Sequence, residues 1–161
     1  MVLTHAVISS PVGDLTVVRS AVGVCGLYMQ ATKRPLTPER LGERDSAAAD
    51  GVADQLAEYF NGERREFDVP LDLTGTPFQR RVWGALLRIP YADRVSYRQI
   101  AVELGIPNAV RALGAANGSN PVSIIVPCHR VVASNGALTG YAGGMERKKF
   151  LLDMEARVAG T

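Results

Sequence analysis

The chain has 161 residues, of which 47% are hydrophobic, 21% charged and 6% aromatic. This composition is typical of a folded globular protein and excludes collagen-like, disordered and disulfide-scaffold chains. Its apolar runs are too short to span a bilayer and its N-terminus does not have the pattern of a signal peptide, so we expect a cytoplasmic protein with no membrane partner.

The soft and imidazole metal ligands are few. They are Cys25, Cys128, His5 and His129, and no CxxC pair is present. Because a tetrahedral zinc site needs about four such ligands close together, we expect neither a metal nor another cofactor. In a reducing compartment both cysteines remain thiols.

The charge is unevenly distributed along the chain. Residues 1–75 carry 7 basic and 11 acidic side chains, a net charge of −4, whereas residues 76–161 carry 11 basic and 5 acidic side chains, a net charge of +6. A nucleic-acid phosphate surface would therefore bind the C-terminal half. A solvated arginine-rich helix face explains the same charge equally well.

The N-terminal half predicts a small sheet and one helix. Short β-rich runs flank a Pro-Val-Gly-Asp turn at 11–14, which predicts a hairpin, and a third strand is expected over 24–29. Residues 35–45 have the composition of a loop. Ser46 is then expected to cap a helix over 47–60 that ends at an Asn-Gly pair.

The C-terminal half predicts helices. Thr76 is a candidate N-cap before a proline at the first helical position. Ser96 is expected to cap a helix over 97–104, and a Gly-x-Pro turn leads to a second helix over 107–116, a helix-turn-helix arrangement. We therefore predict an α+β fold, with an N-terminal antiparallel-sheet-plus-helix domain over 1–75 and a mostly helical domain over 76–161.

The apolar run at 122–126 predicts a strand that ends at Pro-Cys-His-Arg. A free cysteine in such a place is most often a small buried hydrophobe. Because Pro127 has no N–H, however, the chain is expected to leave the sheet there and to leave the sulfur accessible. His129 and Arg130 are expected to lower the pKa of the Cys128 thiol. Adjacent strand residues point to opposite faces, so the sequence does not decide whether Cys128 contacts His129.

The longer motif IVPCHRVVASNGALTGYAGG, together with SNP at 119–121, RALG at 111–114 and a final helix ending LLDMEAR, resembles the active-site region of the O6-alkylguanine-DNA alkyltransferases. The resemblance covers residues 76–161, and the first 75 residues are similar to the more variable N-terminal domain of that family.

The resemblance implies direct-reversal DNA repair. In this reaction Cys128 accepts the alkyl group from O6-alkylguanine, and also from O4-alkylthymine, in one displacement, so that each chain acts once as a methyltransferase. It also implies that His129 is a base reaching the thiol through a water and that Glu155 orients the imidazole. Tyr97 would donate to the leaving guanine, and Asn120 would tie the helix-turn-helix to the active-site turn.

The resemblance further implies a guanine pocket and a minor-groove interface. Main-chain groups of Cys128, Val131 and Ala142 would form the pocket with the ring of Tyr141; some relatives have serine in place of Ala142. The target base is flipped out of the duplex, with little preference for flanking sequence. The residues expected to contact DNA are Arg111, which would fill the vacated space, Ala112, Gly114, Ala115, Ser96 and Arg98, with Arg80, Arg81 and Arg94 as further phosphate contacts.

The expected partner is alkylated double-stranded DNA. We expect no obligate protein partner and a monomer in the free state, and cooperative assembly on DNA is left open. Two other classes compete with this reading: a DNA-binding module without catalysis, and a cysteine hydrolase with a Cys-His pair, which would turn over many substrate molecules.

Overall fold

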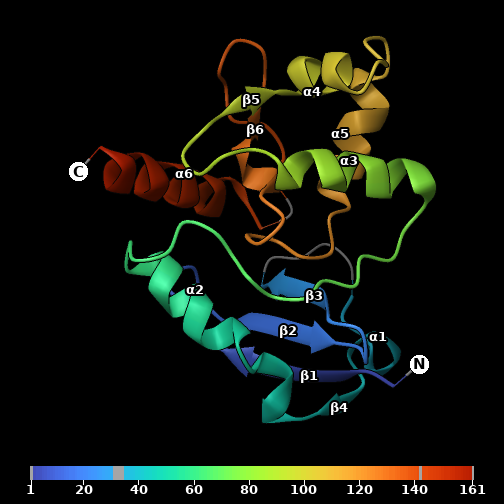
Figure 1. Ribbon diagram of the computed structural model, residues 1–161, viewed down its shortest axis with the longest axis vertical. Helices are drawn as coiled ribbons and strands as arrows, with labels where there is room; N and C mark the ends of the chain where they lie inside the picture. The colour runs from blue at the N-terminus through green and yellow to red at the C-terminus, as the bar shows by residue number, and fades with distance from the viewer. Residues whose placement is uncertain (1, 31–34, 142, 161) are drawn as a thin grey trace.

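The computed structural model describes residues 2–30, 35–141 and 143–160. Its N-terminal part is a small sheet with helices, and the C-terminal helices pack on one side of it (Figure 1). Among the described residues the main sheet has four strands in the order β3-β2-β1-β4. These strands are β1 (Thr4–Ile8), β2 (Leu15–Arg19), β3 (Val24–Met29) and β4 (Glu43–Arg44).

The predicted hairpin and third strand are confirmed. β1 pairs with β2 and β2 with β3, both antiparallel, whereas β1 pairs with the short β4 in parallel. Leu15 and Val17 on β2 are fully buried, and Gly13 in the hairpin turn has a φ of +97°, which glycine adopts readily. The alternating apolar residues and the turn glycine thus specify the same hairpin.

The predicted helix over 47–60 begins later than expected. Residues 46–49 form a short 3-10 helix, η1 (Ser46–Ala49), and the α-helix α2 (Val52–Phe60) begins after Gly51, whose φ is +76°. Gly51 interrupts the helical path because its left-handed backbone cannot continue a right-handed helix. The predicted loop at 35–45 also contains secondary structure, namely β4 and the single-turn helix α1 (Pro38–Leu41).

The C-terminal part contains the predicted helices. They are α3 (Pro77–Leu87), α4 (Tyr97–Glu103), α5 (Val110–Gly118) and α6 (Met145–Ala159), with the 3-10 helix η2 (Cys128–Arg130) and the parallel pair β5 (Val95–Ser96) and β6 (Val131–Val132). Thr76 and Ser96 cap α3 and α4 through complete capping boxes. α5 starts at Val110 rather than Pro107. The fold class is confirmed.

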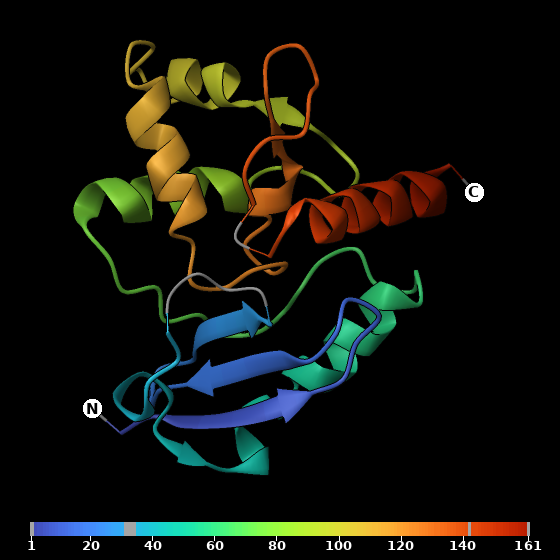
Figure 2. The same ribbon diagram turned by 180° about the vertical axis from the view of Figure 1, so that it is seen from behind.

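The prediction of a strand over 122–126 is wrong. Residues 121–126 form bends and turns, with a parallel bridge between Val122 and Leu27 of β3. The Leu27 amide donates to the Pro121 carbonyl at 2.9 Å, and the Ser123 amide donates to the Leu27 carbonyl at 3.1 Å. Prolines on both sides of the segment prevent a longer ladder, since proline lacks the N–H that a ladder needs. The outer edge of β3 therefore holds the chain just before Cys128 (Figure 2).

One apolar core runs through both parts of the molecule, and it includes Val17 and Leu27 of the sheet and Trp83 and Leu113 of the helices. The indole N–H of Trp83 donates to the Ala116 carbonyl at 2.9 Å, which fixes α3 against α5. In the described ranges, no helix is both long and apolar enough to cross a membrane.

Candidate active site

Cys128 begins η2, and it is 3% exposed. The expectation of an accessible sulfur is therefore wrong, because the turn after Pro127 directs the chain into the core and not away from it. Burial raises the pKa of the Cys128 thiol to about 11, even though a hydrogen bond with Asn120 and the charge of Lys148 oppose this shift. The expected lowering of the thiol pKa is wrong as well, and the resting thiol is protonated at neutral pH.

His129 follows Cys128 in the same 3-10 turn, so the opposite-face geometry of a strand does not apply. Its Nε2 lies 2.8 Å from Oε2 of Glu155, and both side chains are fully buried. Burial lowers the pKa of His129, so the ring is neutral at neutral pH. Nδ1 has no hydrogen-bond partner among the described residues and is the nitrogen available to accept a proton.

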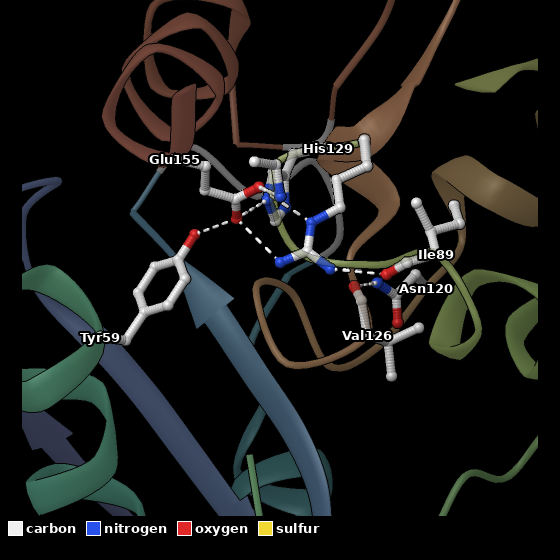
Figure 3. A network of polar contacts seen from close by, with 8 residues as sticks. Tyr59, Ile89, Asn120, Val126, His129 and Glu155 are labelled. Carbon is white, nitrogen blue, oxygen red and sulfur yellow. Dashed lines mark hydrogen bonds and ion pairs between the residues drawn. The ribbon is translucent and has the colours of Figure 1, made fainter. Parts of the chain in front are cut away.

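Glu155 lies at the centre of a buried network (Figure 3). Besides the bond with His129 it accepts two bonds from Arg130, Nε to Oε1 at 2.9 Å and Nη2 to Oε2 at 3.0 Å, one from the Tyr59 hydroxyl to Oε2 at 2.6 Å, and one from the Ala92 amide to Oε1 at 3.3 Å. Burial alone would raise the pKa of Glu155, but the bonds from His129 and Arg130 outweigh it and hold that pKa to about 2. The carboxylate is therefore ionised at neutral pH, and its orientation is fixed from several sides.

Asn120 closes the turn before Cys128. Its Nδ2 donates to the Val126 carbonyl at 2.8 Å, and its Oδ1 accepts from the Val122 amide at 3.0 Å. Both polar ends of this buried amide are thus occupied within one short loop. Asn120 lies two residues after the end of α5 at Gly118, with Ser119 as the C-cap between them.

Lys148 is a residue of the site that the sequence did not predict. This lysine of α6 is fully buried, and its Nζ donates to the carbonyls of Val131 at 2.6 Å and Thr139 at 2.8 Å. Burial lowers the pKa of Lys148 to about 8. A signal was present, since Lys148 and Glu155 are seven residues apart and so share one face of a helix.

A cavity of about 310 Å³ lies beside the turn. It is lined by four of the residues expected from the sequence, Tyr97, Gly114, Asn120 and Tyr141, and Asn120 and Tyr141 also interact electrostatically with Cys128. The other lining residues are Tyr28 and Met29 of β3, Gly118, Ser119, Pro121, Ser123, Thr139, Gly140 and Gly143. Val131 is buried at the start of β6, and Ala142 lies outside the described residues.

The expected DNA face is on α5. Arg111, Ala112 and Ala115 are exposed, Gly114 lines the cavity, and Leu113 of the same helix is buried. The periodicity therefore separates a small-residue surface from the side that packs on the core. Of the remaining candidates, Arg80, Arg81, Arg94 and Arg98 are exposed, and the hydroxyl of Ser96 accepts from the Gln99 amide in the α4 cap.

Two family models match the chain. The one described as the DNA binding domain of 6-O-methylguanine DNA methyltransferase matches residues 77–157, and the one described as its ribonuclease-like domain matches residues 3–73. Together they define a DNA alkyltransferase with both of its usual parts. The chain belongs to the methylated-DNA–protein-cysteine methyltransferase family.

Relatives from distant organisms support this placement. The methylated-DNA–protein-cysteine methyltransferase of Mycobacterium tuberculosis (strain H37Rv) is 49% identical over 94% of this chain and 91% of its own length. That of Methanosarcina acetivorans is 42% identical over 94% of this chain and 97% of its own length. The crystal structure of Mycobacterium tuberculosis OGT in complex with DNA superimposes with a TM-score of 0.90 at 47% identity, covering 96% of this chain and 94% of that one.

Proposed function

We propose that this chain repairs alkylated DNA by moving the alkyl group from O6 of guanine onto Sγ of Cys128. The observation that carries the proposal is a cysteine followed in one tight turn by a buried histidine, whose Nε2 is held by Glu155 at 2.8 Å. A cavity lined by Tyr97 lies next to this group. The family to which the chain belongs, and the names of its relatives, agree with this activity.

The proposed reaction starts with loss of the thiol proton. Because the pKa of Cys128 is about 11, a base must remove this proton, and His129 is neutral with a free Nδ1. The proton passes from Sγ to Nδ1 through a bridging water, and Glu155 stabilises the imidazolium that forms. The carboxylate thus assists at the moment when positive charge appears on the ring.

In the second step the thiolate attacks the alkyl carbon in line with the C–O bond. The S–C bond forms as the C–O bond breaks, and the electron pair of the broken bond remains on the guanine. The hydroxyl of Tyr97 stabilises this charge by hydrogen bonding, and the proton held by His129 balances it. The product is a thioether, which water does not cleave, so each chain reacts once.

The proposed substrate is a base flipped out of duplex DNA, since O6 is not accessible to a thiolate while the base is stacked. The main chain at Cys128 and Val131 and the ring of Tyr141 would hold the flipped base. The exposed small residues of α5 suit a minor groove, and Arg111 would occupy the space that the base leaves. One chain would act alone, since every proposed role falls on residues of a single copy.

The stoichiometry of transfer tests this proposal. We expect one methyl group per chain after incubation with excess duplex containing O6-methylguanine, and none with the undamaged duplex, as measured by intact-protein mass spectrometry. A cysteine hydrolase would instead release product over many turnovers without gaining mass. A DNA-binding module without catalysis would bind the duplex and stay unmodified. Either of these two results would exclude the proposed reaction.

A further inference from the structure

Tyr59 connects the N-terminal part of the fold to the candidate active site. It lies in the last turn of α2, 96 residues before Glu155 in the chain, and donates its hydroxyl to Oε2 of that residue at 2.6 Å. Both side chains are fully buried. Figure 3 shows the Tyr59 ring reaching the carboxylate from the side of the N-terminal helix. The interaction is therefore a long-range bond placed inside the core.

The ring of Tyr59 is held by its neighbours. Its centroid lies 5.2 Å from that of Phe60, 5.3 Å from that of Phe67 and 6.2 Å from that of Tyr91, two of these pairs being edge-on. Burial and the charge of Glu155 raise the pKa of Tyr59 well above its ordinary value, so the hydroxyl keeps its proton. A fixed ring and a retained proton make Tyr59 a directional donor.

Oε2 of Glu155 is shared between three donors. They are the Tyr59 hydroxyl at 2.6 Å, His129 Nε2 at 2.8 Å and Arg130 Nη2 at 3.0 Å. Each donor draws on the negative charge of the same oxygen, so a strong bond from one weakens the hold of the oxygen on the others. Tyr59 thus donates to the same carboxylate oxygen that orients the imidazole of His129.

We propose that Tyr59 is a positioning residue for alkyl transfer: its hydroxyl fixes the Glu155 carboxylate and limits how strongly this carboxylate retains a proton on His129. The proposal rests on the proposed function, because His129 must take a proton from the thiol and then release it. Without the Tyr59 hydroxyl, Oε2 of Glu155 would have one competing donor fewer and would hold the imidazolium more tightly. Among the described residues, only Arg130 and the Ala92 amide would then keep the carboxylate in place.

The charged groups around His129 determine the direction in which its pKa should change when the Tyr59 hydroxyl is removed. Glu155 and Lys148 face it from α6, Arg130 lies beside it in η2, and Tyr59 reaches the shared oxygen from α2. Glu155 favours the protonated ring, and the two cations oppose it. Removal of the Tyr59 hydroxyl leaves more charge on Oε2, so the pKa of His129 should rise.

Tyr59→Phe in the full chain is the test, because it removes the hydroxyl and keeps the ring. Tyr91→Phe is the matched control: Tyr91 belongs to the same aromatic cluster, and its buried hydroxyl has no hydrogen-bond partner within the described ranges. Two quantities are measured for each variant. One is the rate of methyl transfer from O6-methylguanine duplex against pH, and the other is the NMR titration of His129, one of only two histidines in the chain.

For Tyr59→Phe we expect a pKa of His129 higher by about half a unit to one unit, since a hydrogen bond to a charged group is lost. The acid limb of the rate profile should move by the same amount, and the rate on the plateau should fall about 3- to 10-fold, as expected for the loss of one hydrogen bond. Tyr91→Phe should match the unmodified protein in both measurements.

Three results would overturn the role of Tyr59: a slower variant with an unchanged His129 titration, which would indicate a purely structural bond; a shifted titration with an unchanged rate; or no change in either. A failure of the unmodified protein to accept methyl would instead contradict the proposed function. In that case the His129 titration would still report whether Tyr59 controls the carboxylate.

Discussion

The surroundings of Glu155 and the cavity beside Cys128 differ in how their polar groups are used. Around Glu155, Oε2 accepts bonds from Tyr59, His129 and Arg130, and Oε1 accepts a bond from Arg130; these four side chains are buried. The cavity is lined mainly by glycines, aromatic rings and small polar residues, with room of about 310 Å³. The first region holds the carboxylate in place through several bonds and leaves Nδ1 of His129 without a partner among the described residues, and the second region leaves space for a ligand.

This difference indicates where substitutions should affect stability and where they should affect only recognition. Loss of a partner inside a saturated charged network leaves another group buried and unpaired, which is costly. A substitution on the exposed face of α5 would remove only contacts with DNA, which the free protein does not make, so it should leave the stability of the free protein unchanged. The two regions can therefore be separated by measuring stability and transfer on the same variants.

The largest effect is expected for Glu155→Gln. The substitution leaves Arg130 buried without its counter-charge, so the free energy of unfolding should fall by about 3–5 kcal/mol in urea titrations at neutral pH. Methyl transfer should slow by more than about 100-fold, because the imidazole loses the group that orients it. Glu146→Gln, in the exposed first turn of the same helix, is the control and should change stability by less than about 1 kcal/mol. Similar effects of the two substitutions would show that the network is not critical.

The next largest effect is expected on the exposed face of α5. Arg111→Ala should slow transfer from O6-methylguanine in duplex DNA by about 10- to 100-fold, since base flipping costs a few kcal/mol that the arginine would help to offset. The reaction with the free alkylated base should keep its rate, and the unfolding midpoint should be unchanged because Arg111 is exposed. Equal slowing with both substrates would argue against a role in base flipping.

The buried network around Glu155 should also make the stability of the protein depend on pH. Glu155 has a folded pKa of about 2, below its ordinary value of 4.5, so its contribution is complete above about pH 5 and is lost as the pH falls from about 4.5 to about 2. The pKa of His129 is also lowered, so acid favours the unfolded chain below the ordinary histidine value of 6.5. Urea midpoints should therefore decrease steadily from about pH 7 to about pH 2. A midpoint independent of pH in this range would contradict the assigned network.

The smallest effects are expected at the helix caps. Thr76→Ala and Ser96→Ala each remove a capping box, at a cost of about 1 kcal/mol of unfolding free energy. Thr76→Ala should leave transfer unchanged, whereas Ser96→Ala should also weaken duplex binding if Ser96 contacts DNA. Identical binding by the two variants in a fluorescence anisotropy titration would remove Ser96 from the interface.

The parts of the fold that the sequence predicted depend on local interactions. The caps at Thr76 and Ser96 need only the residues three positions further on, and the hairpin needs only its turn and alternating strands. The prediction of a strand at 122–126 failed because, among the described residues, this segment pairs only through one bridge to Leu27, which is far away in the chain. Apolar periodicity alone does not distinguish a ladder from a buried turn.

The candidate site also has residues that the sequence predicted and features that depend on tertiary packing. The short motif predicted Cys128 and His129, and the resemblance added Glu155 as the third member. The burial of Cys128 was not predicted, because it arises from tertiary packing that no pattern near Pro127 reports. Tyr59 lies within the helix predicted over 47–60, but its contact with Glu155 joins residues 96 positions apart and forms only when both parts of the fold are assembled.

The most direct measurement is the position of the alkyl group after reaction. The chain has two cysteines, Cys25 and Cys128, so peptide mapping by mass spectrometry compares one candidate acceptor with an internal control. After reaction with duplex containing O6-methylguanine, we expect a methyl group on the Cys128 peptide and an unmodified Cys25 peptide. Methylation at Cys25, or an unmodified Cys128 after prolonged incubation with a binding-competent duplex, would contradict it.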